Sequence, residues 1–152
     1  MNQPVDLIDH PEGGRFREVF RSAKIVTTDD GKSRSALTHI YFSLDPGEVS
    51  RFHRVSSDEV WNLYRGKGLR LSLWDGTDNP PLDVVLSDET NVFCHVVPAG
   101  YWQAAEPLDD KVLVGCSVGP GFEFEDFELI NPDSNSGSQL CEFGLGRFVE
   151  LR

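Results

Sequence analysis

The sequence predicts an all-β fold in a single domain, on the strength of three observations. Apolar and β-branched residues come in short runs from Arg15 onward, and turn-forming residues separate these runs. No stretch keeps the period near 3.6 that indicates a helix. The 152 residues suffice for one domain that buries roughly two thirds of its unfolded surface. About ten short strands with such turns are typical of a sandwich or a closed barrel.

The strands can be placed in order along the chain. Residues 1–14 lack periodicity and contain His-Pro-Glu-Gly-Gly, so we expect an initial loop there. The expected strands are Arg15–Val26, Ala36–Leu44, Ser50–Val55, Glu59–Tyr64, Leu69–Trp74, Leu82–Leu86, Val92–Val97, Trp102–Ala105, Val112–Val118 and Phe122–Ile130. The separators are rich in glycine, proline, aspartate and asparagine, which tolerate turn geometry.

Composition changes after residue 130. The segment 131–138 is polar and resembles a flexible linker, and apolar residues return at Phe143, Leu145, Phe148 and Leu151. We therefore expect a folded domain over residues 1–130, followed over residues 131–152 by a flexible linker and a C-terminal tail. The pattern leaves three arrangements open for the tail: packing on its own domain, pairing with a neighbouring subunit, or remaining loose.

Net charge and cysteine content indicate which partners and which cellular compartment to expect. Fourteen basic and 25 acidic residues give a net charge of -11, which repels phosphate backbones and anionic lipids. The start of the chain resembles no signal peptide, and no apolar run reaches the ~20 residues of a membrane helix. The three cysteines are widely spaced and odd in number, which fits a reducing compartment. We expect a cytoplasmic protein that binds neither nucleic acid nor membrane.

One stretch, residues 47–66, carries the most informative spacing. Gly47 is followed after five residues by His53, then after five more by Glu59, and after six more by Gly66. This spacing resembles the first motif of the cupin proteins, in which a second histidine stands two residues after the first. Val55 occupies that second position here, so one histidine of the motif is missing.

Three further segments resemble one cupin family in particular. They are His10–Gly14 (HPEGG), Phe52–Glu59 (FHRVSSDE) and Val97–Gln103 (VPAGYWQ). The last contains the Pro-x-Gly pattern of the second cupin motif, with Gln103 in place of its histidine. The chain is thus similar to a poorly characterised cupin family, of the DUF985 or Cupin_5 kind. The resemblance covers residues 15–130 and these motifs.

The resemblance implies a fold and a general role. The fold would be a cupin jelly-roll β-barrel, also called a double-stranded β-helix. Members are frequently homodimers, and their pocket has been likened to that of sugar epimerases. The expected partner is therefore a small-molecule ligand, such as a sugar derivative or another small polar metabolite.

Strand alternation indicates how such a site could work. His53 and Val55 share one strand face, which points inward in cupins. If Glu59 also points inward, Trp61 and Leu63 follow it and supply apolar walls. His53 could then act as a general base next to a carbonyl, with Glu59 orienting it, as in an epimerase or isomerase. A satisfied structural pair of His53 and Glu59 is the competing interpretation.

Other residues complete this hypothesis. Tyr41, Tyr64 and Tyr101 are candidates for the opposing acid, and Tyr64 is grouped with His53 and Glu59 as catalytic. The candidate substrate contacts are Trp61, Gln103, His39, Tyr41 and Glu18. His10, His39 and His95 have no ligand partner at motif spacing, and each is interpreted as a surface or strand-filling residue.

Two alternatives remain open from the sequence. His53, Glu59 and Gln103 could hold one divalent transition metal, Fe, Mn, Ni or Zn, in a lyase, isomerase or oxygenase. Replacement of two imidazoles by Val55 and Gln103 would weaken that site. The second alternative is a ligand-binding cupin without catalysis.

Overall fold

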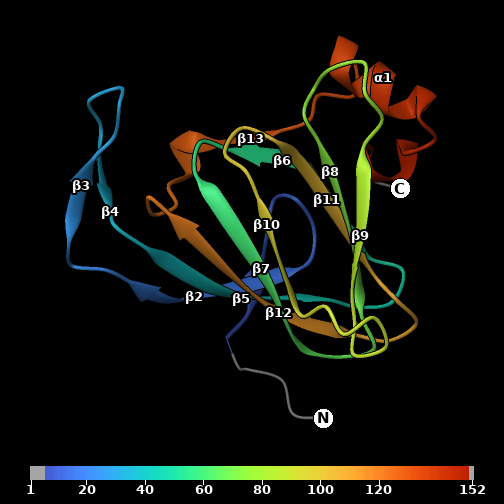
Figure 1. The fold of residues 1–152 in the computed structure, drawn as a ribbon, viewed down its shortest axis with the longest axis horizontal. Helices are drawn as coiled ribbons and strands as arrows, with labels where there is room; N and C mark the ends of the chain where they lie inside the picture. Colours follow the sequence, from blue (N-terminus) through green and yellow to red (C-terminus); the bar gives the residue numbers. More distant parts are fainter. Residues whose placement is uncertain (1–5, 151–152) are drawn as a thin grey trace.

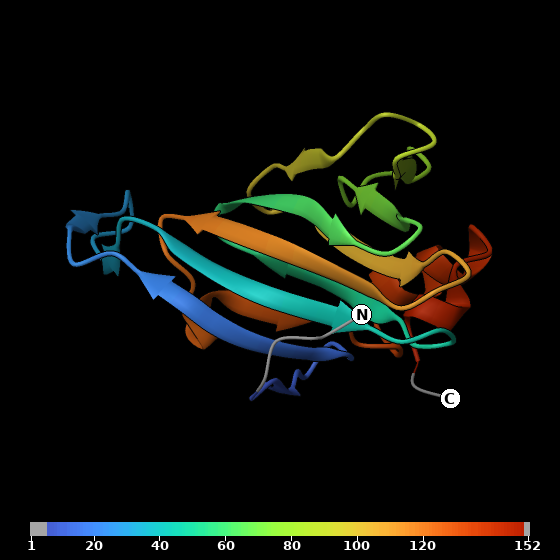
Figure 2. The ribbon, with the colours of Figure 1, turned by 90° about the horizontal axis from the view of Figure 1, so that it is seen from below.

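The computed structural model describes residues 6–150 and contains two antiparallel sheets that form a jelly roll (Figures 1 and 2). The larger sheet has six strands in the order β1-β2-β5-β12-β7-β10. Their bounds are Ile8–Asp9 (β1), Arg15–Arg21 (β2), Thr38–Leu44 (β5), Val112–Gly119 (β12), Asp58–Arg65 (β7) and Cys94–Val97 (β10). Neighbours distant in sequence, such as β7 and β12, make long antiparallel pairs.

The second sheet has five strands in the order β13-β6-β11-β8-β9. Their bounds are Phe127–Leu129 (β13), Ser50–Val55 (β6), Trp102–Pro107 (β11), Leu69–Trp74 (β8) and Leu82–Leu86 (β9). A separate hairpin of β3 (Ile25–Thr27) and β4 (Ser33–Ser35) projects at the end of the molecule opposite the C-terminal helix α1 (Figures 1 and 2). Within residues 6–150, no helix is long and apolar enough to cross a membrane.

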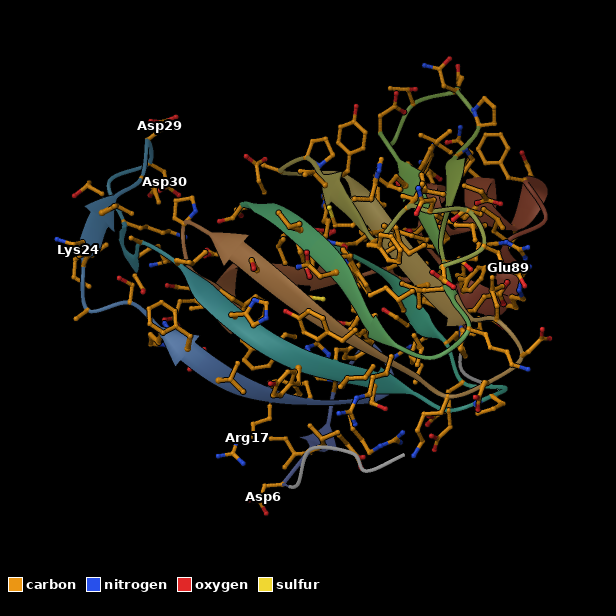
Figure 3. All side chains as sticks on the ribbon, turned by 60° about the horizontal axis from the view of Figure 1, so that its bottom comes forward. Asp6, Arg17, Lys24, Asp29, Asp30 and Glu89 are labelled. Carbon is orange, nitrogen blue, oxygen red and sulfur yellow. The ribbon has the colours of Figure 1, made fainter. Side chains whose placement is uncertain are left out.

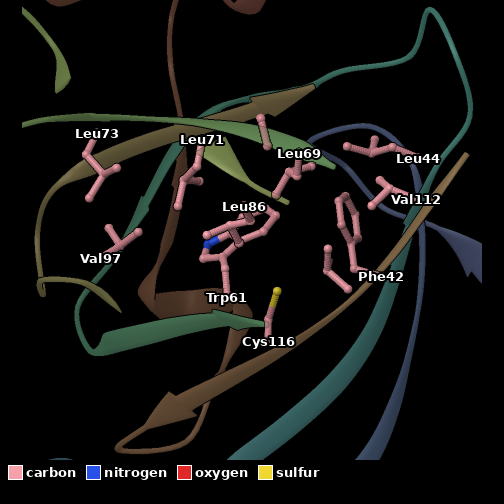
Figure 4. Packing of buried hydrophobic residues seen from close by; sticks show 12 residues of the cluster. Phe42, Leu44, Trp61, Leu69, Leu71, Leu73, Leu86, Val97, Val112 and Cys116 are labelled. Carbon is pink, nitrogen blue, oxygen red and sulfur yellow. The ribbon is translucent and has the colours of Figure 1, made fainter. Parts of the chain in front are cut away.

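An apolar core fills most of the space between the sheets. Phe42, Trp61 and Leu71 come from three different strands and are almost completely buried. Figure 4 shows the Trp61 ring among Leu71, Leu86, Phe42 and Cys116. Because alternate residues of a strand point to opposite faces, the inward positions of β5 and β7 supply this core. The buried polar residues His53, Glu59 and Gln103 lie outside this apolar cluster.

The C-terminal segment folds against the outer face of the five-stranded sheet. Phe148 and Val149 are fully buried in a second cluster with Phe52 and Trp102. This is the first of the three arrangements left open for the tail. The expected flexible linker is wrong for its second half, because the Ser134 hydroxyl accepts a hydrogen bond from the Gly137 amide and begins helix α1 (Asn135–Glu142).

Two expected strands differ most from the structure; in addition, β1 lies in the expected initial loop, β4 forms where no strand was expected, and the expected strand 92–97 begins at Cys94. The range 15–26 divides into β2 and β3, because residues 22–24 leave the sheet to begin the projecting hairpin. The range 122–130 begins instead with a 3₁₀ turn, η1 (Phe124–Asp126), and only then forms β13. A second 3₁₀ turn, η2 (Gly146–Phe148), follows α1. The turn at η1 brings Phe124 and Phe127, three residues apart, into contact.

Candidate functional site

A small pocket lies between the sheets where β6 ends and β7 begins. Its volume is about 30 Å³, space for only one or two water molecules. Four ionisable side chains line it together with one threonine and six apolar residues: His10, Glu12, His53, Glu59, Thr38, Phe16, Ile40, Val55, Val118, Phe122 and Phe127. His53 and Glu59 thus share one hollow, as the sequence predicts. Apolar walls with a few polar groups are typical of ligand sites.

The imidazole of His53 is held on both its edge and its face. Its Nδ1 lies 2.7 Å from the carbonyl oxygen of Arg51. Because a carbonyl only accepts, Nδ1 carries the proton and Nε2 keeps a lone pair. The ring stacks on Phe127, with centroids 5.5 Å apart, and only 2% of the residue is exposed. Burial lowers the pKa of His53, which favours the neutral form.

Glu59 belongs to a buried chain of hydrogen bonds. The Gln103 amide nitrogen donates to Glu59 Oε1 at 3.0 Å, and the Trp61 indole donates to the Gln103 oxygen at 2.6 Å. Burial raises the pKa of Glu59 to about 7, although the nearby His53 opposes the shift. Trp61 and Gln103 therefore stand behind Glu59 and orient it. They do not line the pocket, where the sequence places them as substrate contacts.

Glu12 is one of two ionisable pocket residues that the sequence prediction missed. Its Oε2 lies 3.3 Å from Nδ1 of His53 and accepts a hydrogen bond from the Ser50 hydroxyl. Burial raises the pKa of Glu12 to about 8. His10, interpreted above as a surface or strand-filling residue, is buried beside it, with Nδ1 3.2 Å from Glu12 Oε1. The surface interpretation of His10 is wrong.

A glycine pair explains why the initial loop reaches the pocket. Gly13 and Gly14 both have positive φ, at 113° and 70°. A Cβ atom on Gly13 would lie 2.2 Å from the carbonyl oxygen of Val49. Only glycine permits both this conformation and this close approach. The glycines after His10 and Glu12 were thus the signal for a loop pressed against the sheet, which the strand pattern could not convey.

Several predicted site residues lie elsewhere. His39 bonds Ser117 and the Tyr64 hydroxyl, and the Tyr41 ring contacts Tyr64. These residues occupy the outer face of the six-stranded sheet, because Ile40 on the same strand faces the pocket. Glu18 lies at the sheet edge in an ion pair with Arg21. The assignments of Tyr64 as catalytic, and of His39, Tyr41 and Glu18 as substrate contacts, are not supported by these positions.

The predicted metal ligands do not fit a coordination site. The only oxygen of the Gln103 amide accepts from Trp61, so its nitrogen faces Glu59. An amide nitrogen with two protons offers no lone pair to a metal. Val55 supplies no donor, and no group of three His, Cys, Asp or Glu side chains suited to a metal exists within residues 6–150. His53, Glu59 and Gln103 therefore do not form a metal-binding set.

Phe122 and Phe127 line one side of the pocket and contact Phe124, and these three rings are called the aromatic rim. The rings contact one another edge to face, and Phe127 also covers His53. Arg34, from the projecting hairpin, pairs with Asp126 at 2.8 Å and Glu125 at 2.6 Å, which anchors the rim segment. This pairing raises the pKa of Arg34 and lowers the pKa of Asp126.

A larger surface hollow exists but lacks this chemistry. It measures about 550 Å³ and lies between the projecting hairpin, Ser56–Ser57 and Pro120. Its ionisable residues are Asp29, Asp30, Lys32, Arg34 and Asp126. Two of them, Arg34 and Asp126, neutralise each other in the ion pair above. The buried pocket, with four ionisable groups of altered pKa, is the better candidate for a functional site.

The family model described as Cupin superfamily (DUF985) matches residues 3–130. The chain belongs to the cupin superfamily. This cupin is 31% identical over 141 residues to the uncharacterized protein YML079W of Saccharomyces cerevisiae, a match that covers 82% of this chain and 70% of the yeast protein.

Solved structures agree on the fold of this cupin. Protein SO0799 of Shewanella oneidensis is 29% identical, with a TM-score of 0.83 and coverage of 95% of this chain and 91% of that one. Oxalate decarboxylase of Bacillus subtilis superposes with a TM-score of 0.60 at 15% identity, over 90% of this chain and 34% of its own. The second likeness concerns the fold alone.

Proposed function

We propose that this cupin binds a small uncharged polar molecule and transfers a proton to and from it through Nε2 of His53. The observation that supports this most is the 2.7 Å contact of Nδ1 with the Arg51 carbonyl. It fixes the proton on Nδ1 and leaves Nε2 as an acceptor. The lowered pKa of His53 keeps that acceptor unprotonated at neutral pH. Glu59 lines the same pocket and would stabilise the imidazolium formed during transfer.

The ligand class follows from the charges around the pocket. Among the lining residues there is no lysine or arginine. Arg51 and Arg54, the cations nearest His53 in sequence, bond instead to the Pro11 carbonyl and to Glu128. A carboxylate or phosphate ligand would therefore be desolvated without a counter-ion. Transfer of the oxalate chemistry of the Bacillus neighbour to this chain is accordingly disfavoured, and an uncharged hydroxyketone or sugar derivative fits better.

Ligand access requires the aromatic rim to move. A volume of about 30 Å³ is far below the ~300–1,000 Å³ of typical ligand pockets. The other walls are strands held by ladder hydrogen bonds and the initial loop with His10 and Glu12, which is pressed against Val49 at Gly13. The rim, in contrast, lies in and beside the 3₁₀ turn η1, where ion pairs of Glu125 and Asp126 hold it. We infer that displacement of Phe122 and Phe127 enlarges the pocket when a ligand binds.

Hydrogen exchange at carbon tests the proton transfer. The protein is incubated in D₂O with a panel of aldoses, ketoses and uncharged hydroxyketones, and deuterium next to the carbonyl is followed by NMR. We expect at least one compound to exchange, with a loss of about 100-fold or more in His53→Ala. Tyr64→Phe, on the outer sheet face, is the matched control and should keep the rate. Undiminished exchange in His53→Ala contradicts the proposal, and tight binding without exchange indicates a non-catalytic ligand-binding cupin.

We also propose that two copies associate through the outer face of the six-stranded sheet. The tail covers the other sheet, while Phe20, Tyr64 and Val96 remain 50%, 46% and 49% exposed on this one. The net charge of -11 opposes the association of two copies. An exposed apolar face is therefore the surface through which two copies would associate. Light scattering should give a dimer mass for the wild type and a monomer mass for Phe20→Glu combined with Val96→Lys. A monomeric wild type refutes this.

A further inference from the structure

Two histidines flank one buried carboxyl in this pocket. Glu12 Oε1 lies 3.2 Å from Nδ1 of His10, and Glu12 Oε2 lies 3.3 Å from Nδ1 of His53. The Glu12 residue is only 6% exposed, and each histidine is buried as well. The proton positions in such a group can be deduced, because some of the neighbours can only donate and others can only accept.

The two imidazoles must carry their protons on different nitrogens. The backbone amide of Glu12 donates to Nδ1 of His10 at 3.2 Å, so this Nδ1 has a lone pair and the proton lies on Nε2. The Arg51 carbonyl accepts from Nδ1 of His53, so that Nδ1 has the proton. Glu12 therefore faces a lone pair on one side and an N–H on the other.

The carboxyl must match both neighbours. An ionised carboxylate would set lone pairs of Oε1 against the lone pair of His10 Nδ1. A proton on Oε1 removes this repulsion, and Oε2 still accepts from the Ser50 hydroxyl and from His53. We propose that Glu12 is a positioning residue that acts as a neutral carboxylic acid. Its Oε1–H shares the Nδ1 lone pair of His10 with the Glu12 backbone amide, and its Oε2 shares the Nδ1–H of His53 with the Arg51 carbonyl, which holds His53 with Nε2 free.

Burial and charge support the same assignment. The pKa of Glu12 is raised to about 8, mainly by burial, and the pKa of His10 is lowered to about 3 by burial and by the nearby His53. Glu59 is the other ionisable group that faces this cluster, and a negative charge on Glu12 raises its pKa, so the two carboxyls disfavour ionising together. The assignment rests on the proposed function and deepens it, because Glu12 supplies a second acceptor, beside the Arg51 carbonyl, for the Nδ1 proton of the His53 base.

Nitrogen spectroscopy tests the proposal without any substrate. The protein has four histidines, so ¹⁵N-histidine labelling and long-range ¹H–¹⁵N spectra at pH 7 can identify each ring, with His→Gln variants for assignment. We expect neutral rings, with the proton of His53 on Nδ1 and that of His10 on Nε2. An imidazolium at either position, or the opposite tautomer, overturns the proposal.

Two substitutions sharpen the test. The Gln amide in Glu12→Gln can donate to His10 and accept from His53, as a neutral acid does, so both tautomers should persist. Glu12→Leu keeps the apolar bulk without these bonds, and the Nδ1–H population of His53 should fall. Ser50→Ala, which removes only the hydroxyl donor, serves as the control and should keep both tautomers. A changed tautomer in Glu12→Gln contradicts a neutral Glu12.

The tautomer spectra and the deuterium-exchange assay can fail independently of each other. If the tautomers are as stated and His53→Ala keeps the deuterium exchange, proton transfer by His53 is refuted while the hydrogen-bonded cluster stands. If His53→Ala loses the exchange and the tautomers differ, the role of Glu12 is refuted while the base stands. Where exchange is found, Glu12→Gln should retain its rate within about threefold and Glu12→Leu should lose it about tenfold or more.

Discussion

The indole nitrogen of Trp61 lies 2.6 Å from the amide oxygen of Gln103, and this contact determines which end of the amide meets Glu59. An indole N–H can only donate, so the oxygen must face Trp61 and the nitrogen must face the carboxyl. Gln103 is completely buried and cannot exchange these partners for water. Trp61 thus determines the direction of the hydrogen bonds that lead from its indole through Gln103 to Glu59 in the pocket.

Trp61→Phe should cost more stability than its loss of volume explains. It leaves the Gln103 oxygen buried without a donor, a penalty of about 1–3 kcal/mol. Trp102→Phe is the control, since Trp102 is as large and is also buried but belongs to the cluster under the tail. Urea unfolding of both variants measures the difference. Equal losses would show that the indole bond contributes nothing.

Stability should fall with pH around neutrality because of Glu12. In the folded state the Glu12 carboxyl keeps its proton up to about pH 8, whereas in the unfolded chain it loses the proton near its ordinary pKa of 4.5. A raised carboxyl pKa stabilises the fold at low pH, and that stability is lost as pH rises through the folded value. Glu12→Gln cannot ionise. From pH 6.5 to 8 the wild type should lose about 1.5 kcal/mol relative to this variant.

Parallel urea titrations of the two proteins check this difference. Contributions from groups that do not interact with Glu12 are common to both proteins and cancel, whereas Glu59 is coupled to Glu12 and needs its own comparison. Glu59→Gln is a useful second comparison, because the pKa of Glu59 is raised only to about 7 and its effect should saturate at lower pH. A constant difference between wild type and Glu12→Gln across this range would mean that Glu12 ionises normally.

Arg34→Gln should loosen the aromatic rim. Arg34 is buried and holds Asp126 and Glu125, so its loss leaves Asp126 without its main counter-ion. Amide hydrogen exchange over residues 122–129 should accelerate by about tenfold or more, while the core strands keep their protection. Arg54→Gln removes the exposed pair with Glu128 and is the control. Similar exchange in the two variants would argue against Arg34 as the anchor.

Phe148→Ala should destabilise the whole domain. The ring is fully buried and meets Phe52 of β6 edge to face, with centroids 6.0 Å apart. Removal of such a ring typically costs about 3–5 kcal/mol. Phe143, which is only half buried at the margin of the same cluster, should give a clearly smaller loss when replaced by alanine. Thermal and urea unfolding provide the comparison.

Much of the fold could be predicted from the sequence because strand alternation and turns are local signals. The strands Ser50–Val55, Leu69–Trp74 and Leu82–Leu86 are confirmed at both ends. Helix α1 was missed, because it is a short helix in a polar segment and depends on the Ser134 cap and on packing of Leu140. The 3₁₀ turn before β13 was missed because alternating Phe and Glu imitate a strand.

The site was predictable only where it lies on regular strands. Alternation and the cupin spacing placed His53 and Glu59 in one pocket. His39 was misplaced because the sequence does not reveal which face of β5 points inward. Tyr64 was misplaced because, on β7, it lies two residues after the outward Asn62 and therefore on the face opposite to Glu59. Glu12 and His10 could not be found by periodicity, since a loop reaches the pocket through the tertiary contact of Gly13 with Val49.

Figure 3 labels six exposed charged residues, of which Asp6, Arg17, Lys24, Asp29 and Asp30 lie at the outer edge of the molecule in this view, and the sixth is Glu89. Several of the peripheral acids are paired with arginine or lysine, as in Asp6 with Arg17 and Asp30 with Lys32. The pocket groups, in contrast, are enclosed. Surface substitutions and changes in salt should therefore have little influence on the His53 environment.

Because Phe127 stacks on His53, the access of water to the imidazole depends on the position of the Phe127 ring. When the phenyl ring swings away, water reaches the imidazole and the desolvation that depresses its basicity is relieved. His53 thus takes up a proton more readily when the Phe127 ring is displaced than when it covers the imidazole. Closure over an uncharged guest would expel that proton and regenerate the free base at the moment the guest is enclosed.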